Sequence, residues 1–315
     1  MLSRIANSLF WMSRYLERTE HISRYIKVHF YSALDAPSVA GYEFIENSIL
    51  NMTGLESEYK KKIHKKNIKN VNYYVLLDET NPVSIRNSVN RARENARGAR
   101  DSISAEIWSS MNKFYHDVNR LSADDLSNDK IYPLTEKILE NCAVVKGYIE
   151  STLLHNEIWL IMKMGMHTER TIQVIRIIKA KLADIEFTRK QKLGKPVENY
   201  QCINMLKSAE AFDMSRIYYR AVPTLSEALE FLFFNKQFPK SLVYNMRHLH
   251  NSISRITASK NPVPGSAEFD AGKLYSQLNY ATIQDVEDNL DLFLDNLTEK
   301  IYSIATKTEQ QFMSY

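Results

Sequence analysis

Apolar residues recur at helical spacing along most of the chain. In the first thirty residues they fall three or four positions apart, at Leu2, Ile5, Leu9, Met12 and Leu16. Ile26 and Phe30 continue the same register, in which Thr19 and Ser23 occupy the two missing places. This spacing places them on one face of an amphipathic helix of about eight turns. The segment "NYYVLLD" near Tyr73 is the only candidate strand, and a helix end explains it equally well. We therefore predict an all-α protein.

A second strong helix is expected to begin near Asn81. Asn81 suits an N-cap and Pro82 suits the first helical position. Its apolar face consists of Ile85, Val89, Ala92, Ala96, Ala99 and Ile103. Because most of these side chains are alanines, the backbone of a neighbouring helix can approach closely.

Further helical patterns cover most of the remaining sequence. They are predicted over residues 105–121, 133–154, 157–189, 197–221, 225–233, 239–259 and 282–313. Irregular structure is expected in part of 35–69, over 122–130 and in "KNPVPGSAEFDAGK" from Lys260. The chain contains only eight glycines and eight prolines, which leaves few breaks between the helices.

A charged signature occurs twice. Glu17, Arg18, Thr19 and Arg24 recur 152 residues later as Glu169, Arg170, Thr171 and Arg176. A second echo, "VLLDETNPVSI" from Val75 and "LFFNKQFPKSL" from Leu232, has an offset of 157. The two echoes come in the same order and at nearly the same spacing. We interpret the chain as a multi-helix bundle of two diverged, duplicated helical halves, residues 1–147 and 148–315, that form one compact unit.

Charged residues form a strip on each of the first two strong helices. The strip on the first contains Arg14, Glu17, Glu20, His21 and Arg24, and that on the second contains Arg86, Asn90, Arg93, Glu94, Arg97 and Asp101. If the strips face each other, Glu17 and Glu94 lie among several guanidinium groups. They would then be either ion pairs that hold helices in register or a pocket for a carboxylate or phosphate. From the residues alone the structural interpretation is favoured, because charged side chains at helix interfaces are common structural devices.

Composition narrows the classes of partner. Of 315 residues, 41 are basic and 37 acidic, and this balance favours neither nucleic acid nor membrane as a partner. Two cysteines, Cys142 and Cys202, and the lack of a long apolar run indicate a cytoplasmic protein. No Glu-x-x-His pair or glycine-rich phosphate loop occurs, so neither a metal nor a cofactor is expected. The sequence leaves the oligomeric state open.

At "SLFWMSRYLERTEHISRYI" and "NPVSIRNSVNRARENARGARDSISAEIWSSMN" the chain is similar to the bacterial alpha-E family. The resemblance extends through the second Glu-Arg helix to "FPKSLVYNMRHL", and Thr19 departs from the alanine expected there. It implies an all-helical fold and two partners, an ATP-grasp-type ligase and a transglutaminase-like peptidase, in a system that makes or modifies peptide bonds. The motif positions carried over are Glu17, Arg18, Arg93, Glu94, Asn95, Arg97, Arg100 and Asp101.

Two functions remain open at this stage. The first is a non-catalytic accessory protein that binds the ligase or presents a peptide substrate to it. The second is an enzyme whose arginine-rich pocket orients a carboxylate or acyl phosphate, with Glu17 or Glu94 as general base. Arginines would lower the pKa of such a base and weaken it, so we prefer the accessory role. The residues of the anion site or ion-pair network are Arg14, Glu17, Arg18, Arg24, Arg86, Arg93, Glu94, Asn95, Arg97, Arg100 and Asp101, with Glu169, Arg170 and Arg176 in the second copy.

Overall fold

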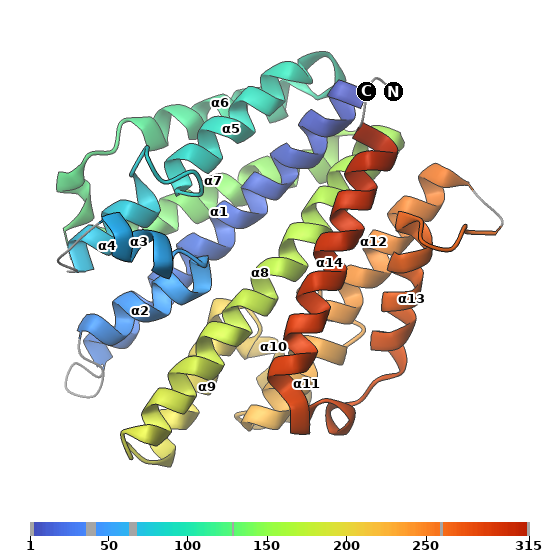
Figure 1. Ribbon diagram of the computed structural model, residues 1–315. Coiled ribbons are helices and arrows are strands. Elements are labelled where there is room, and N and C mark those ends of the chain that lie inside the picture. Colours follow the sequence, from blue (N-terminus) through green and yellow to red (C-terminus); the bar gives the residue numbers. More distant parts are fainter. Residues whose placement is uncertain (1–2, 36–41, 63–67, 128, 259–260, 314–315) are drawn as a thin grey trace.

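The computed structural model describes residues 3–35, 42–62, 68–127, 129–258 and 261–313, and all regular secondary structure within them is helical (Figure 1). The helices of the first half are α1 (Ser3–Asp35), α2 (Tyr42–Thr53), α3 (Glu56–Lys62), α4 (Ile68–Leu76), α5 (Ile85–Gly98), α6 (Ala105–Asn119) and α7 (Ile131–Thr152). Those of the second half are α8 (Glu157–Lys190), α9 (Lys195–Ser208), α10 (Phe212–Tyr219), α11 (Leu225–Phe234), α12 (Leu242–Thr257), α13 (Ala267–Tyr280) and α14 (Leu290–Met313). The all-α prediction is confirmed for these residues.

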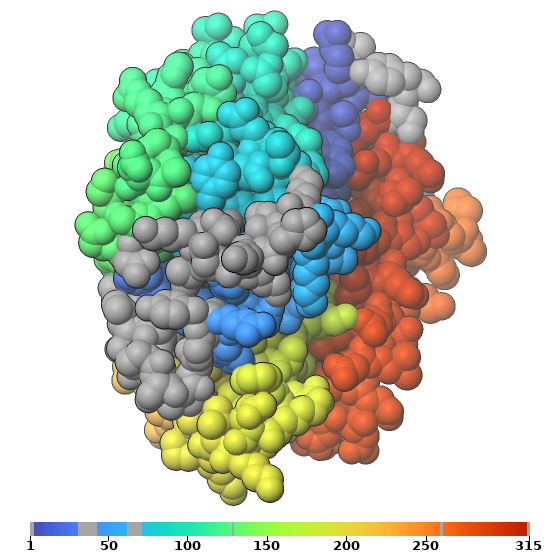
Figure 2. All heavy atoms as spheres, turned by 60° about the vertical axis from the view of Figure 1, so that its left-hand side comes forward, coloured from blue at the N-terminus to red at the C-terminus, as the bar shows by residue number. Residues whose placement is uncertain are grey.

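Two long helices, α1 and α8, lie side by side in the centre and run in the same direction (Figure 1). On one side, α1 packs against α5 and α7, and α6 closes the group by contacting both. On the other side, α8 packs against α12 and α14, and α13 contacts both. Figure 2 shows the same division at the surface, with α5–α7 on one side and α14 on the other. Eight of the helices thus form two four-helix groups joined along α1 and α8.

Small residues set the spacing of the central helices. Gly165 of α8 lies so close to α1 that a Cβ atom built on it would come 2.2 Å from the carbonyl oxygen of Phe10. Ala92 and Ala96 of α5 and Ala99 directly after it are buried, as the alanine face predicted. Side chains of this size let backbones approach closely, and the resulting contact fixes α1 against both of its neighbours.

The start of α5 differs from the prediction. Ser84, not Asn81, is the N-cap, and its hydroxyl accepts the backbone N–H of Asn87 at 3.2 Å. Asn81 instead organises the preceding turn: its side chain accepts the N–H of Val83 and donates to the carbonyl of Tyr74. The Asn-Pro pair therefore forms the turn before the helix, because a turn and an N-cap favour the same residue types.

The helix predicted over 197–221 is two helices. The backbone of Glu210 has a φ of 54°, in the left-handed region, and this ends α9 before α10 begins. The N–H of Ala211 reaches back to the carbonyl of Leu206 at 2.7 Å, as in a helix-ending turn. Glycine usually occupies such a position. A glutamate there gives no sequence signal, so the break was missed.

Other differences concern short helices. The segments predicted as irregular contain α2 and α3, although residues 36–41 and 63–67 lie outside the described residues. Of the stretch predicted as irregular from Lys260, whose first residue lies outside the described residues, 261–265 are irregular, and Ser266 then caps α13. The candidate strand near Tyr73 forms the end of α4. The helix predicted over 282–313 starts with two 3-10 turns, and α14 itself begins at Leu290.

The two proposed halves meet between α7 and α8. Helix α7 continues past residue 147 to Thr152, and α8 begins at Glu157. Within the described ranges, no helix is both long enough and apolar enough to cross a bilayer.

Candidate functional site

The two Glu-Arg motifs pair with each other across α1 and α8. Arg170 donates from Nε and Nη2 to the two carboxylate oxygens of Glu17, at 3.1 and 2.7 Å. In return, Arg18 and Arg14 donate to the two oxygens of Glu169, at 2.7 and 2.9 Å. Both glutamates are fully buried. We call this reciprocal arrangement of Glu17, Arg18, Glu169 and Arg170 the Glu-Arg clamp.

Parallel packing explains why the pairing is reciprocal. Phe10 of α1 lies level with Gly165 of α8, and Tyr25 lies level with Lys181. The motifs fall between these two contacts, so each glutamate is at the height of the other helix's arginine. The planar guanidinium can meet a carboxylate with two parallel hydrogen bonds, which suits a pair fixed in one geometry.

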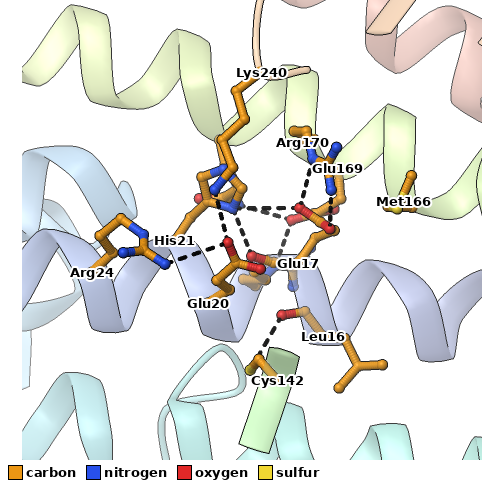
Figure 3. A network of polar contacts seen from close by, with 12 residues as sticks. Leu16, Glu17, Glu20, His21, Arg24, Cys142, Met166, Glu169, Arg170 and Lys240 are labelled. Carbon is orange, nitrogen blue, oxygen red and sulfur yellow. Dashed lines mark hydrogen bonds and ion pairs between the residues drawn. The ribbon is translucent and has the colours of Figure 1, made fainter. Parts of the chain in front are cut away.

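Further charges extend the clamp toward the surface (Figure 3). Lys146 of α7 pairs with both Glu17 and Glu20. Lys240, just before α12, donates to Glu20 at 2.7 Å and also pairs with Glu210. Arg24 of α1 then pairs with Glu210, whose side chain is 41% exposed. The network therefore runs from a fully buried ion pair to a partly exposed one.

The surrounding cations keep the buried carboxylates ionised. Burial alone would raise the pKa of Glu17, but Arg170 and Lys146 more than offset it and hold the pKa well below its usual range. Burial likewise opposes ionisation of Glu169, and Arg18 and Arg14 keep its pKa low. A carboxylate with a strongly lowered pKa is a weak base. The clamp is thus a set of fixed charges.

His21 lies on α1 beside Glu17 (Figure 3). Its Nδ1 lies 2.8 Å from the backbone carbonyl of Glu17, to which it donates. Burial, and then Lys240, lower the pKa of His21 to about 4, while Glu17 and Glu20 act in the opposite direction. The imidazole is therefore neutral in the folded protein at neutral pH.

We expect the fold to lose stability as the pH falls. Between 6.5 and about 4, the unfolded chain binds a proton on His21 that the folded chain does not. Stability is therefore full above the unfolded pKa and declines below it, by about 2 kcal/mol near pH 5 from this group alone. The buried His29 and His167, whose pKa values burial also lowers, add to the same trend. Urea unfolding at about pH 7.5 and about pH 5 measures the loss.

Two histidine variants test the origin of this pH dependence. His21→Gln should reduce the difference in unfolding free energy between the two pH values, because it removes the titrating group. His116→Gln is the matched control, since His116 is exposed on α6. An equal pH dependence in His21→Gln and wild type would contradict the assignment.

The charged strip of α5 does not face that of α1. The alanine face of α5 packs on α1, which turns the strip toward α6 and solvent. Arg93 lies over the rings of Trp108 and Tyr115, at 5.3 and 5.1 Å from their centroids, and pairs with Glu94. Glu94 is exposed and also pairs with Arg97. The expectation that Glu17 and Glu94 share one arginine-rich pocket is therefore wrong.

The other predicted residues are also dispersed. Arg86 donates to the carbonyl of Leu121, and Arg100 lies 5.0 Å from the ring centroid of Trp108. Asn95 is half-buried and Asp101 is exposed in a 3-10 turn. Arg176 in the second copy is outside the clamp and donates to the carbonyl of Thr53 at 3.4 Å. Of the predicted set, the structure brings together Arg14, Glu17, Arg18, Arg24, Glu169 and Arg170.

Sequence reasoning missed the residues that complete the network. Lys146 follows the apolar run "AVV" in α7, and Lys240 stands within the echo "FPKSL". A lysine in an apolar stretch signals a buried partner, whereas Glu210 carries no such signal. None of them lies near the motifs in sequence, so only the fold reveals the network.

A cleft opens where the network reaches the surface. Its volume is about 730 Å³, and it lies between α1, α9 and α10. Arg24 and Glu210 belong both to the network and to its wall. The remaining lining residues are Lys27, Val28, Tyr200, Asn204, Lys207, Phe212 and Asp213. In the part of the chain that the structure describes, no cluster of three or more His, Cys, Asp or Glu side chains could hold a metal ion.

Comparison with known proteins places the chain in a family. Residues 1–313 match the Alpha-E model, described as a predicted alpha-helical domain with a conserved ER motif. An uncharacterised protein of Mycobacterium bovis and two of Mycobacterium tuberculosis strains are each 22% identical to it over 283 residues. The match covers 84% of this chain but only 30% of those relatives, and no solved structure matches. A family match over nearly its whole length shows that the chain belongs to the Alpha-E family.

Proposed function

We propose that this protein is a non-catalytic accessory component of an ATP-grasp-type peptide (amide) ligase system, which binds the ligase or presents a peptide substrate to it. The observation that carries the proposal is the Glu-Arg clamp. Its glutamates are fully buried, ionised and held by fixed cations from α1, α7 and α8. A motif used in this way joins the two halves of a scaffold and leaves binding to the surface.

The geometry gives less support to the enzymatic alternative. An arginine-rich pocket for an acyl phosphate requires guanidinium groups that converge on free space. Arg93 and Arg100 instead lie over Trp108, and Arg170 is committed to Glu17. Glu94, the second candidate base, is exposed beside Arg93 and Arg97. We therefore keep the accessory role.

Helix α10 offers a surface for the ligase. Its outer face exposes Met214, Ile217 and Tyr218, by 50, 64 and 61%. Arg216 and Arg220 flank these side chains and are exposed as well. Adjacent apolar side chains with a charged rim are typical of protein interaction sites. We expect the partner to present an apolar surface bordered by carboxylates.

The length of the mycobacterial relatives is consistent with a helical unit that acts together with another protein unit. In the mycobacterial proteins the matched region makes up 30% of a longer chain. There the helical unit is joined covalently to further sequence, which is the arrangement expected of a unit that acts beside another.

The variant Ile217→Asp tests the docking surface. We expect it to weaken the complex with the ATP-grasp ligase at least tenfold, because it places a carboxylate in an apolar contact facing an acidic rim. Leu292→Asp is the matched control, since Leu292 is 60% exposed on α14, which packs mainly against α1, α8 and α13. Titration calorimetry measures the affinity of each variant and of the wild-type chain for the ligase. The transglutaminase-like peptidase is titrated in the same way as a second partner. No complex with the wild-type chain, or equal affinity for both variants, would contradict the proposal.

We also propose that the two halves arose by duplication. Ser84 caps α5 and Ser241 caps α12, and each cap lies in the second sequence echo. The four-helix group of α1, α5, α6 and α7 has the same pattern of helix contacts, in the same order along the chain, as the group of α8, α12, α13 and α14. The reciprocal clamp is what a two-fold relation between the halves would produce. Superposition of the two four-helix groups should bring Glu17 onto Glu169. Unrelated positions of the two glutamates after superposition would contradict the duplication.

A further inference from the structure

The cleft between α1, α9 and α10 contains one unpaired charge of each sign. Its other cations are satisfied: Arg24 pairs with Glu210, and Lys27 pairs with Glu136. Lys207 and Asp213 line the same cleft, and no described residue forms an ion pair with either of them. They do not pair with each other, so they lie beyond ion-pair distance. A ligand that carries both charges could satisfy both.

Aromatic side chains line the cleft together with the two unpaired charges. Phe212 lies at the start of α10, one residue before Asp213, and the Lys207 ammonium is 5.7 Å from its ring centroid. Tyr200 contributes a second half-buried ring to the wall. The cleft volume of about 730 Å³ lies in the range typical of sites for small organic ligands. Most of the other lining side chains are charged or polar, so a ligand of this cleft is expected to be polar as well.

Glu210 holds one part of the cleft wall in place. It keeps a left-handed backbone conformation, with a φ of 54°, that usually selects glycine. Its carboxylate holds Arg24 and Lys240, which anchors the end of α9 to α1 and to the segment before α12. The turn that follows carries Phe212 and Asp213 into position. The backbone positions of Lys207 and Asp213 are therefore set by a turn that Glu210 ties to Arg24 and Lys240.

We propose that this cleft binds a zwitterion of the amino-acid type, a short peptide or a free amino acid. The ligand carboxylate meets Lys207, its ammonium group meets Asp213, and its apolar part lies against Phe212 and Tyr200. This inference deepens the proposed function and rests on it for the peptide, because it names a site for the substrate that the protein would present. Binding by the isolated chain is measured without the ligase, so the two can fail separately. Since the cleft shares α10 with the exposed apolar face, a bound peptide would lie next to a docked partner.

Four probes test the proposal by NMR shift titration of the isolated chain. They are the tripeptide Ala-Leu-Ala, its N-acetylated form, its C-terminal amide and free leucine. We expect saturable shifts at cleft residues with the tripeptide, and binding about three- to fivefold weaker when either charge is capped. Leucine separates the two sources: binding equal to that of the tripeptide identifies an amino-acid site, and weaker binding identifies a peptide site.

Two substitutions link the charges to the residues. Lys207→Gln should remove the penalty for C-terminal amidation, and Asp213→Asn should remove the penalty for N-acetylation. Lys236→Gln and Asp291→Asn are matched controls, exposed and outside the cleft, and should bind as wild type does. No saturable shift with the tripeptide or leucine, or equal binding of capped and uncapped probes, would overturn the proposal. A failed ligase titration alone would leave it intact.

Discussion

Replacing Glu17 by glutamine is expected to lower the free energy of unfolding by about 3–5 kcal/mol, the usual cost of breaking a buried ion pair by removing one partner. The change keeps the size of the side chain but leaves Arg170 and Lys146 without the carboxylate that both contact. Arg170, whose side chain is only 12% exposed, is then a partly compensated charge with little access to water. The corresponding fall in Tm is roughly 5–10 °C.

Glu94→Gln is the control for this prediction. It makes the same chemical change at the second candidate base, in a side chain that is 48% exposed. Because water solvates Arg93 and Arg97 when the carboxylate is removed, the expected change is within about 0.5 kcal/mol. Urea unfolding of both variants at neutral pH makes the comparison, and equal effects would remove the distinction between clamp and surface pair.

Gly165→Ala is expected to be comparably disruptive for a different reason. The added Cβ would lie 2.2 Å from the carbonyl oxygen and 3.0 Å from the carbonyl carbon of Phe10. Both atoms are backbone, so relief requires α1 and α8 to move apart, which disturbs the clamp one turn further along. Overpacking of this kind costs about 3 kcal/mol, more than the 0.5–1 kcal/mol that alanine gains in a helix.

Gly147→Ala provides the matched comparison. Gly147 is exposed in α7, and a Cβ built on it meets no atom within 4 Å. The same substitution should therefore raise the free energy of unfolding by about 0.5–1 kcal/mol, through helix propensity alone. In thermal unfolding, the Tm should fall for Gly165→Ala and rise for Gly147→Ala. A neutral or stabilising Gly165→Ala would mean that α1 and α8 do not need their close approach.

Much of the fold could be predicted because the long helices have strong apolar periodicity. The stripe of α5 buries one face, and that pattern is visible in the residues, whereas α1 and α8 lie in the centre and are buried on most sides. Short elements were less predictable, since α2 and α3 compete with turn-forming composition. The end of α9 depends on Glu210 in a left-handed conformation, which tertiary ion pairs stabilise and local sequence does not announce.

The candidate site divides in the same way. The repeated motif identified Glu17, Arg18, Glu169 and Arg170, because a motif that recurs in order indicates equivalent positions. Their reciprocal pairing could not be predicted, since it depends on α1 and α8 being parallel and level. The α5 strip was misplaced because helical spacing shows which residues share a face but not which neighbour that face meets. Because the alanine face of α5 packs on α1, the charged strip meets α6 and solvent instead.

The central claim is that the two Glu-Arg motifs hold the halves together as one reciprocal clamp. A double-mutant cycle between Glu17→Gln and Arg170→Met, measured by urea unfolding, tests it most directly. If Glu17 and Arg170 act on each other, the double variant loses less than the sum of the single losses, by about 1–3 kcal/mol. Additive losses, with a coupling energy near zero, would contradict the clamp and return the motif to an unassigned role.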